Sequence, residues 1–334
     1  FLFKKVEDNL PLFLLICGAA AVTAAGIWHR GLVLHALREP LHICLVVLIL
    51  GFIFKKFSAR LAGAAAGCVN KFGIKATLAG IVIIISLASS IITAILAALL
   101  LSEVSTMLCI TRRQRVKFIV YACFAISAGA VLTPIGEPLA TIVISKLSGA
   151  PYYAGEFFLL KLLWPYVFSI IAIMAALAYK ITDEQTDSPA CPRAVALTDN
   201  ADVIKRAAKV YIFVAALVLL GAALGPGAQE IILRLSARQI YWVNLSAAAL
   251  DNATVAAIAA GPHLPPKTLV YLLVSLIISG GLLVPGNIPN IISAAKLKIS
   301  AKEWAREGVF LGLALFAFYF AVLSVYYEVF ARAQ

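Results

Sequence analysis

Two apolar segments, one in each half of the chain, are interrupted by prolines at matching positions. ISAGAVLTPIGEPLATIVISKL (126–147) and IISGGLLVPGNIPNIISAAKLK (277–298) align with a shift of 151 residues, which brings Pro134 onto Pro285. A helix that is broken inside a membrane leaves backbone N–H and C=O groups unpaired, at several kcal/mol each, unless protein, water or a bound ion satisfies them. Paired breaks therefore predict a polar site near the membrane midplane and are typical of transporters built from repeats.

The composition is that of a polytopic membrane protein. Hydrophobic residues make up 63% of the 334 residues and charged residues 13%, and the mean hydropathy is +0.99. Apolar runs of about 20 residues, enough to cross a bilayer, recur throughout the chain. The net charge of +12 is confined to short loops between apolar segments. It therefore indicates membrane orientation, and no nucleic-acid partner is expected.

We expect seven spanning segments and two apolar hairpins that enter and leave the membrane on one side. The spans are placed at 11–28, 40–56, 116–147, 155–180, 205–224, 267–297 and 305–330. The hairpins are placed at 77–110 and 237–262. This topology gathers most Lys and Arg residues on one face. The positive-inside rule then places the N-terminus and the linker 181–204 in the cytoplasm and the C-terminus outside. The expected location is the plasma (inner) membrane of a prokaryotic-type cell.

The same topology makes the two halves an inverted repeat. Residues 1–39 contain an N-terminal accessory transmembrane helix, 40–180 the first repeat, 181–204 a cytoplasmic linker and 205–334 the second repeat. Each repeat contains a re-entrant hairpin and a Pro-broken transmembrane helix, and the second repeat enters from the opposite side. The expected fold class is an all-α polytopic membrane protein with two inverted repeats.

The hairpins also carry matching polar clusters. LSEVS at 101–105 aligns with LDNAT at 250–254 with a shift of 149 residues. About 10 residues of helix cover half of a ~30 Å membrane core, so each cluster is predicted to be a hairpin tip beside the breaks. The polar residues expected to meet there are Ser102, Glu103, Ser105, Thr133, Glu137, Asp251, Asn252, Thr254, Asn287 and Asn290.

Three of these residues are carboxylates, and no Lys or Arg lies within the tips and breaks. An ionised carboxylate inside a membrane costs at least ~2.5–3.5 kcal/mol, so it must be paired, protonated or bound to an ion. A transported cation is the simplest partner, and Glu137 and Asp251 are its predicted main ligands. Glu103 precedes Arg112 by nine residues, so pairing or an interfacial position is its alternative. The hydroxyl and amide side chains can cap half-helices as well as bind an ion.

LTPIGEP at 132–138, LDNAT at 250–254 and PGNIPN at 285–290 resemble the ion transporter superfamily. The closest similarity is to its NhaD-type sodium/proton antiporters and to small proteins assigned as cation transporters. Members with carboxylate substrates carry Ser-Asn-Thr at both tips, whereas this chain has Ser-Glu-Val-Ser and Asp-Asn-Ala-Thr, which favours cations. The first tip also lacks the Asp-Asn pair of the antiporter branch. The resemblance implies a homodimer with a scaffold and a transport domain that moves like an elevator.

We therefore expect a secondary active transporter that exchanges Na⁺ or Li⁺ for protons by alternating access. It would have no resident cofactor and no enzymatic activity, and its partners would be the lipid bilayer, the monovalent cation and protons. The alternative is a Na⁺-coupled carboxylate or oxyanion transporter, in which half-helix N-termini at 139 and 290 bind the anion. An intramembrane aspartyl protease using Asp251 would not call for paired Pro breaks. A channel is not separated from a carrier by sequence.

Overall fold

A computed structural model describes residues 10–181, 200–232 and 234–330 of the chain. These residues form α-helices with short 3₁₀ and π turns and contain no β-strand. Most of the predicted linker 181–204 and both chain ends lie outside the described residues. The predictions for the linker and for the sidedness of the ends therefore stay predictions.

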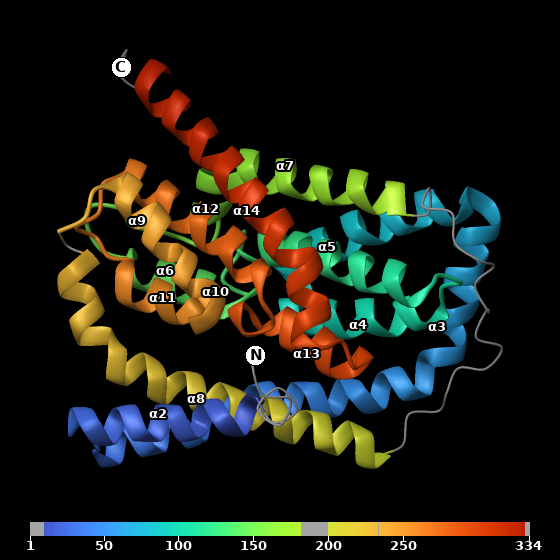
Figure 1. The fold of residues 1–334 in the computed structure, drawn as a ribbon, viewed down its shortest axis with the longest axis horizontal. Helices are drawn as coiled ribbons and strands as arrows, with labels where there is room; N and C mark the ends of the chain where they lie inside the picture. The colour runs from blue at the N-terminus through green and yellow to red at the C-terminus, as the bar shows by residue number, and fades with distance from the viewer. Residues whose placement is uncertain (1–9, 182–199, 233, 331–334) are drawn as a thin grey trace.

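Each half of the chain contains long helices and shorter ones joined by breaks (Figure 1). The first half contains α2 (Leu10–Ala25), α3 (Arg30–Ile92), α4 (Ala94–Met107), α5 (Arg112–Ala130), α6 (Pro138–Lys146) and α7 (Phe158–Lys180). The second half contains α8 (Asn200–Ile232), α9 (Ala237–Val243), η2 (Asn244–Ser246), α10 (Ala247–Leu250), α11 (Asn252–Ala259), α12 (Pro266–Leu282), η3 (Val284–Gly286), α13 (Ile288–Leu297), α14 (Ala301–Val325) and η4 (Tyr326–Phe330).

Helix α3 differs from the predicted organisation. It is 63 residues long and joins the predicted span 40–56 to the first half of the predicted hairpin. The predicted boundary between the accessory segment 1–39 and the first repeat therefore lies inside this helix. The helix bends at Gly73, where φ is 77°. Glycine adopts such a positive φ at little steric cost, which explains how the chain turns here without a loop.

Three helical segments of the described chain are long and apolar enough to cross a membrane: Gly67–Ile92, Phe158–Lys180 and Ala301–Glu328. The shorter apolar helices of 10–17 residues are Pro11–Ala25, Ala94–Met107, Tyr211–Leu224 and Pro266–Leu282. At most 39% of the most apolar window of each long segment is buried within the protein. Large apolar side chains such as Ile91 and Phe310 remain exposed, at 72% and 81%. The fold fits a helical membrane protein, whose apolar outer surface is in contact with lipid.

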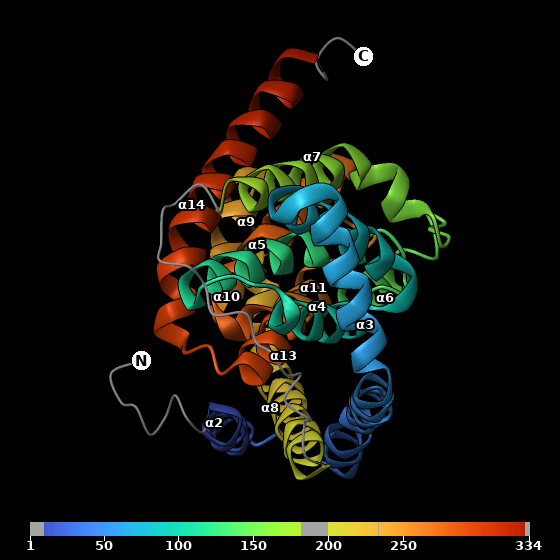
Figure 2. The ribbon, with the colours of Figure 1, turned by 90° about the vertical axis from the view of Figure 1, so that its right-hand side faces the viewer.

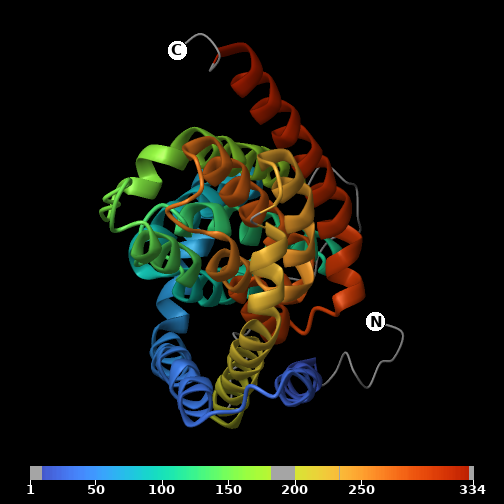
Figure 3. The same ribbon diagram turned by 90° about the vertical axis from the view of Figure 1, so that its left-hand side faces the viewer.

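The helices form two bodies. Helices α2, α8 and the N-terminal part of α3 form a three-helix layer along one side of a larger main body, and the later part of α3 runs along one end of that body; Figures 2 and 3 show the layer from the two ends of the molecule. The layer has its own apolar core around Val22 and Leu219. The main body contains a much larger core in which Phe124 and Trp304 are fully buried. Six residues form the apolar cluster between the bodies: Ala98, Leu99, Ala207, Val214, Ile288 and Ile292.

Within the main body, Gly129 of α5 allows a close approach to α3. A Cβ atom at this position would lie 1.8 Å from the carbonyl oxygen of Ser86. The hydroxyl of Ser89 donates to the carbonyl of Ile126 at 3.1 Å across the same contact. Small residues and bridging serine hydroxyls are common means of association between membrane helices.

We expect Gly129→Ala to lower the melting temperature because the new methyl group overlaps the Ser86 carbonyl, and overpacking of this kind costs about 1–3 kcal/mol. Gly80→Ala in α3 is the matched control, since no atom lies within 4 Å of a Cβ atom there. That change should be neutral or stabilising by up to about 1 kcal/mol through helix propensity. Thermal unfolding in detergent compares both variants with the parent, and equal melting temperatures would contradict the described α3–α5 contact.

Candidate functional site

Two helix breaks share the same unusual backbone geometry. Thr93, between α3 and α4, has φ 78° and ψ 148°, and Asp251, between α10 and α11, has φ 78° and ψ 132°. A positive φ is uncommon outside glycine and is an outlier for a β-branched residue. Such conformations cost about 1–3 kcal/mol each and cluster at functional sites.

Each of these two residues caps the helix that follows it. Thr93 Oγ1 accepts a hydrogen bond from the N–H of Leu96 at 3.3 Å. Asp251 Oδ2 accepts one from the N–H of Thr254 at 3.2 Å and one from the Thr254 hydroxyl at 3.4 Å. The cap fixes the start of α4 and α11 at these positions.

The first break lies before the predicted tip. The alignment of LSEVS with LDNAT predicts a tip at 101–105, but these residues belong to the uninterrupted helix α4. The dihedral angles pair Thr93 with Asp251 instead. A polar cluster does not by itself mark a helix break, and Thr93 lies in the apolar run IITAIL, where no sequence signal distinguishes it from a buried helical threonine.

Ser102 and Glu103 lie at the contact between α4 and α13, and the Ser105 hydroxyl donates to the Ser102 carbonyl within α4. The Ser102 hydroxyl donates to Ser293 Oγ at 3.2 Å, and Glu103 forms an ion pair with Lys296. The side chains of this pair are only 11% and 9% exposed. Pairing, the alternative kept for Glu103, is thus what the structure shows, with Lys296 as the partner. Glu103 lies nine positions after the first residue of α4, about 14 Å along the helix, so these three residues do not join the others.

The two predicted Pro-containing interruptions are confirmed. Helix α5 ends at Ala130 before α6 begins, and α12 ends at Leu282 before the short turn η3 and α13. The residue before each second helix is extended, with φ −156° and ψ 159° at Glu137 and φ −156° and ψ 150° at Asn287. Neither side chain caps its own helix, so both are available for other partners.

The helix starts at these four breaks lie close together. The N–H of Ala94, at the start of α4, donates to the carbonyl of Gly136 at 2.7 Å. The Glu137 carboxylate is hydrogen-bonded by the Asn287 side chain and lies near enough to Asp251 for the two carboxyl groups to interact electrostatically. Each helix N-terminus carries roughly +0.5 elementary charge, which partly offsets the two carboxylates.

Four buried polar atoms of the described chain have no hydrogen-bond partner: Glu137 Oε1, Asp251 Oδ1, Asn252 Nδ2 and Asn290 Oδ1. Their residues are at most 4% exposed. The amide nitrogen of Asn290 donates to the carbonyls of Gly280 and Leu283 at 2.7 and 3.0 Å, so its oxygen is the end left free. The Asn252 amide nitrogen lies 3.3 Å from the Cβ position of Gly280. An unpaired buried polar group costs about 1–3 kcal/mol, so these atoms are expected to bind a ligand.

The two predicted threonines have local partners. The Thr133 hydroxyl donates to the carbonyl of Ser90 and holds the first Pro break against α3. The Thr254 methyl group faces α8, where it lies 3.0 Å from the Cβ position of Gly221. The structure therefore brings together Glu137, Asp251, Asn252, Asn287 and Asn290, with Thr254 bound to the Asp251 carboxylate. Sequence reasoning missed Thr93 and Ser127, whose Oγ accepts from Asn287 Nδ2 at 2.7 Å.

The family model described as "Protein of unknown function (DUF1646)" matches residues 1–326 of the chain. The chain belongs to the DUF1646 family. No curated protein and no solved structure matches it. The family description names no activity, so the function has to be argued from the site.

The site of this DUF1646 chain adjoins a cavity of about 360 Å³, lined by Glu137 and by residues around the first two breaks and the start of α13. The described residues contain no group of three or more His, Cys, Asp or Glu that could hold a metal ion. A bound ion would instead have two carboxylates and the Asn290 amide oxygen as side-chain ligands. Such hard oxygen ligands suit alkali or alkaline-earth cations better than transition metals.

Proposed function

We propose that the protein is a secondary active transporter that exchanges a monovalent cation, Na⁺ or Li⁺, for protons. The observation that carries the proposal is the excess of acceptors among the buried unpartnered atoms, three oxygens on Glu137, Asp251 and Asn290 against one nitrogen on Asn252. Oxygen acceptors without donors attract a cation or a proton. Since the helix N-termini partly offset the two carboxylates, the site favours a singly charged ion over a divalent one.

The proposed coupling is competition for the same oxygens. A carboxyl group that holds a proton cannot ligate a cation through that oxygen, and a bound cation displaces the proton. Two carboxyl groups that repel each other favour a state in which protons or a cation compensate their charge. Exchange then requires no further coupling element than Glu137 and Asp251.

Matched features of the two halves support an inverted repeat. Besides the paired dihedral angles, Gly136 and Gly286 occupy equivalent tight positions, where a Cβ atom would lie 2.0 Å from the Ala130 carbonyl and 2.6 Å from the Gly280 carbonyl. The two glycines are 150 residues apart, as are Glu137 and Asn287, the residues that precede α6 and α13; this spacing is one residue shorter than the shift that aligns Pro134 with Pro285. In transporters, such repeats generate alternating access around a site fixed between them.

Two lysines continue the same match. Lys146 ends α6 and its ammonium group donates to the carbonyls of Ala257 and Ala260 near the end of α11. Lys296, also 150 residues later, lies in the last turn of α13 and pairs with Glu103 of α4. Helix α6, which follows the first Pro break, thus packs on α11, and α13, which follows the second Pro break, packs on α4. Each of these partners begins at the strained break of the other half, as expected if the two repeats interlock.

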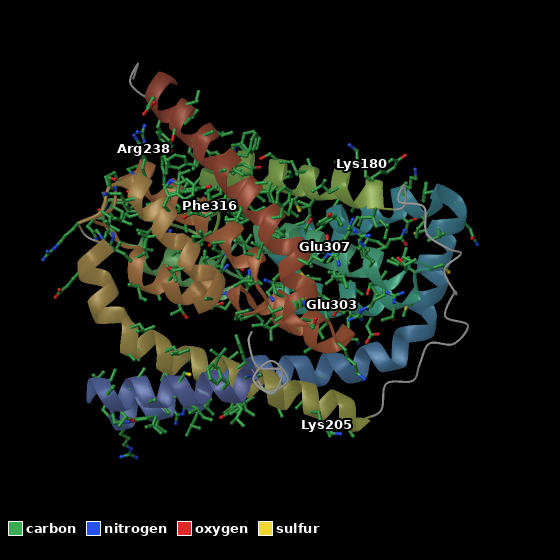
Figure 4. All side chains as sticks on the ribbon, in the orientation of Figure 1. Lys180, Lys205, Arg238, Glu303, Glu307 and Phe316 are labelled. Atoms are coloured by element: carbon green, nitrogen blue, oxygen red, sulfur yellow. The ribbon has the colours of Figure 1, made fainter. Side chains whose placement is uncertain are left out.

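An elevator-like displacement is part of the proposal, with α8 as the element that joins the two bodies. Helix α8 shares a small apolar cluster with α4 and α13 and also places Phe213 and Ile232 in the core of the main body. In Figure 4, Lys180 and Lys205 lie toward one end of the molecule and Arg238 toward the other, the arrangement expected if the predicted cytoplasmic and outer faces are these ends. The homodimer and the prokaryotic-type inner membrane remain parts of the proposal.

The convergence of helix N-termini favours a second candidate, a Na⁺-coupled carboxylate or oxyanion transporter. Four positive helix ends near one cavity would attract an anion. In this chain, however, Glu137 and Asp251 already place carboxylates at two of these ends. A further anion would need a bound cation beside it to offset the repulsion.

Proton movement in proteoliposomes tests the proposal. A pH gradient is imposed across vesicles that contain the purified protein, and an internal pH dye reports the response to Na⁺, Li⁺, K⁺ or a dicarboxylate. Saturable dissipation of the gradient by Na⁺ or Li⁺ is the expected result. Dicarboxylate uptake that requires Na⁺ without proton movement would establish the second candidate, and flux that does not saturate or exchange would indicate a channel.

A further inference from the structure

The cavity beside Glu137 is larger than Na⁺ exchange requires. Its volume is about 360 Å³, whereas one water molecule needs only ~10–15 Å³ of such space. Pockets that bind small organic ligands begin at about 300 Å³. A sodium ion at Glu137 would leave most of this space to water.

The walls of the cavity are mainly aliphatic. Ile95, Ile135, Ile142 and Ile288 line it together with three prolines. Water gains little from such walls, while an alkyl group placed against them is stabilised in proportion to the apolar area that it removes from water. The lining therefore fits the body of an organic ligand better than a hydrated ion.

The polar groups of the lining specify the charge of that ligand. Among the described lining residues, Glu137 is the charged one, and the others that are polar are Thr93, Thr141 and Asn287. Glu137 is 4% exposed and its Oε1 has no hydrogen-bond partner. A buried carboxylate oxygen without a donor calls for a positively charged group that supplies one.

The type of cation follows from the absence of aromatic rings among the described lining residues. Quaternary ammonium ions, which have no N–H groups, are typically held by aromatic cages. A protonated primary or secondary amine has N–H donors for Glu137 Oε1 and a chain for the isoleucine walls. Thr93, also in the lining, adds a hydroxyl oxygen as a further acceptor, although this oxygen also accepts the N–H of Leu96.

We propose that this cavity binds short-chain alkylammonium ions, with the ammonium group at Glu137 and the alkyl chain against Ile95, Ile142 and Ile288. The inference rests on the proposed function, because it extends the cation that exchanges with protons from Na⁺ to a protonated amine. On binding, the ammonium ion takes the place of the proton on Glu137, and that proton is released to solvent. The alkylammonium ion keeps all of its own protons, so one positive charge, that of the ammonium group, replaces the positive charge of the released proton.

Calorimetric titration of the purified protein in detergent tests the inference, since neutral amines cross vesicle membranes unaided and would obscure a flux assay. The probes are n-butylammonium, methylammonium, tetramethylammonium and Na⁺ chlorides. Affinity should rise about fourfold for each methylene group added between methylammonium and n-butylammonium. Tetramethylammonium should bind no better than methylammonium, because it cannot donate to the carboxylate.

Ile142→Trp, which reduces the space for the alkyl chain and keeps both carboxylates, should weaken n-butylammonium binding at least about tenfold and leave Na⁺ binding unchanged. Ile135→Trp at the exposed mouth, where Ile135 is 62% exposed, is a second variant with less risk to folding. Equal affinities for methylammonium and n-butylammonium would overturn the inference, and so would an unchanged n-butylammonium affinity in both variants. In either case, Na⁺ binding would leave the proposed function intact. Failure of all four cations to bind, Na⁺ included, would overturn the proposed function itself.

Discussion

Asp251→Asn is expected to abolish Na⁺/proton exchange and to leave the fold intact. The amide keeps the size of the side chain, tolerates the positive φ at this position and can still accept the N–H of Thr254. It removes the charge and the titratable proton. The loss of a charge-assisted ligand worth about 1.5–3 kcal/mol weakens cation binding roughly 10- to 100-fold. Proteoliposome exchange measured at several Na⁺ concentrations gives both the rate and the apparent affinity.

Thermal unfolding separates this effect from misfolding. Removing a buried carboxylate with an unpartnered oxygen relieves its burial cost, so Asp251→Asn and Glu137→Gln should melt no lower than the parent without Na⁺. Added Na⁺ should raise the melting temperature of the parent according to RT ln(1 + [L]/Kd) and have little effect on either variant. An equal Na⁺-dependent shift in the parent and Asp251→Asn would remove Asp251 from the site and favour the anion transporter.

Glu303→Gln is the matched control for loss of a carboxylate. Glu303 lies at the start of α14 (Figure 4) and pairs with Arg112 at 3.1 Å in an exposed position. Exposed pairs contribute at most about 1 kcal/mol, and this one lies outside the group of unpartnered atoms. The variant should keep exchange and Na⁺-dependent stabilisation. A loss as large as that of Asp251→Asn would mean that any carboxylate change disables the protein.

Breaking the buried Glu103–Lys296 pair is expected to destabilise the protein strongly. Glu103→Gln or Lys296→Met leaves the other charge buried without its partner, which typically costs about 3–5 kcal/mol. Replacing both residues together should recover most of the stability, because no uncompensated charge then remains. A double-mutant cycle from thermal or denaturant unfolding measures the coupling between the two residues.

The same variants decide whether Glu103 has a role in transport. If its carboxylate only joins α4 to α13, the double variant should keep Na⁺/proton exchange. Loss of exchange in the double variant, with the stability of the parent, would return Glu103 to the cation site. An unchanged melting temperature in both single variants would contradict the ion pair.

Local chemistry is sufficient for much of the fold. Apolar runs long enough to span a bilayer predict the helices, and α7 and α14 lie where the sequence places them. Proline lacks a backbone N–H and cannot continue a helix without loss, so the interruptions near Pro134 and Pro285 are also local properties. Asp251 and Glu137 are recognisable because a carboxylate in an apolar segment is costly wherever the chain folds. These features are determined by the sequence without reference to distant residues.

Only the tertiary structure decides which polar residues meet. Ser102 contacts Ser293, 191 residues away, and Glu103 finds Lys296 across the same contact, so neither partner is apparent from its own segment. Thr93 adopts a strained backbone because the packed helices around it compensate the cost, and no local pattern predicts such a conformation. The unpartnered oxygens of Glu137, Asp251 and Asn290 likewise become a site only when the four helix starts converge. Convergence depends on packing between elements far apart in the chain, which is the information that periodicity and local propensity do not contain.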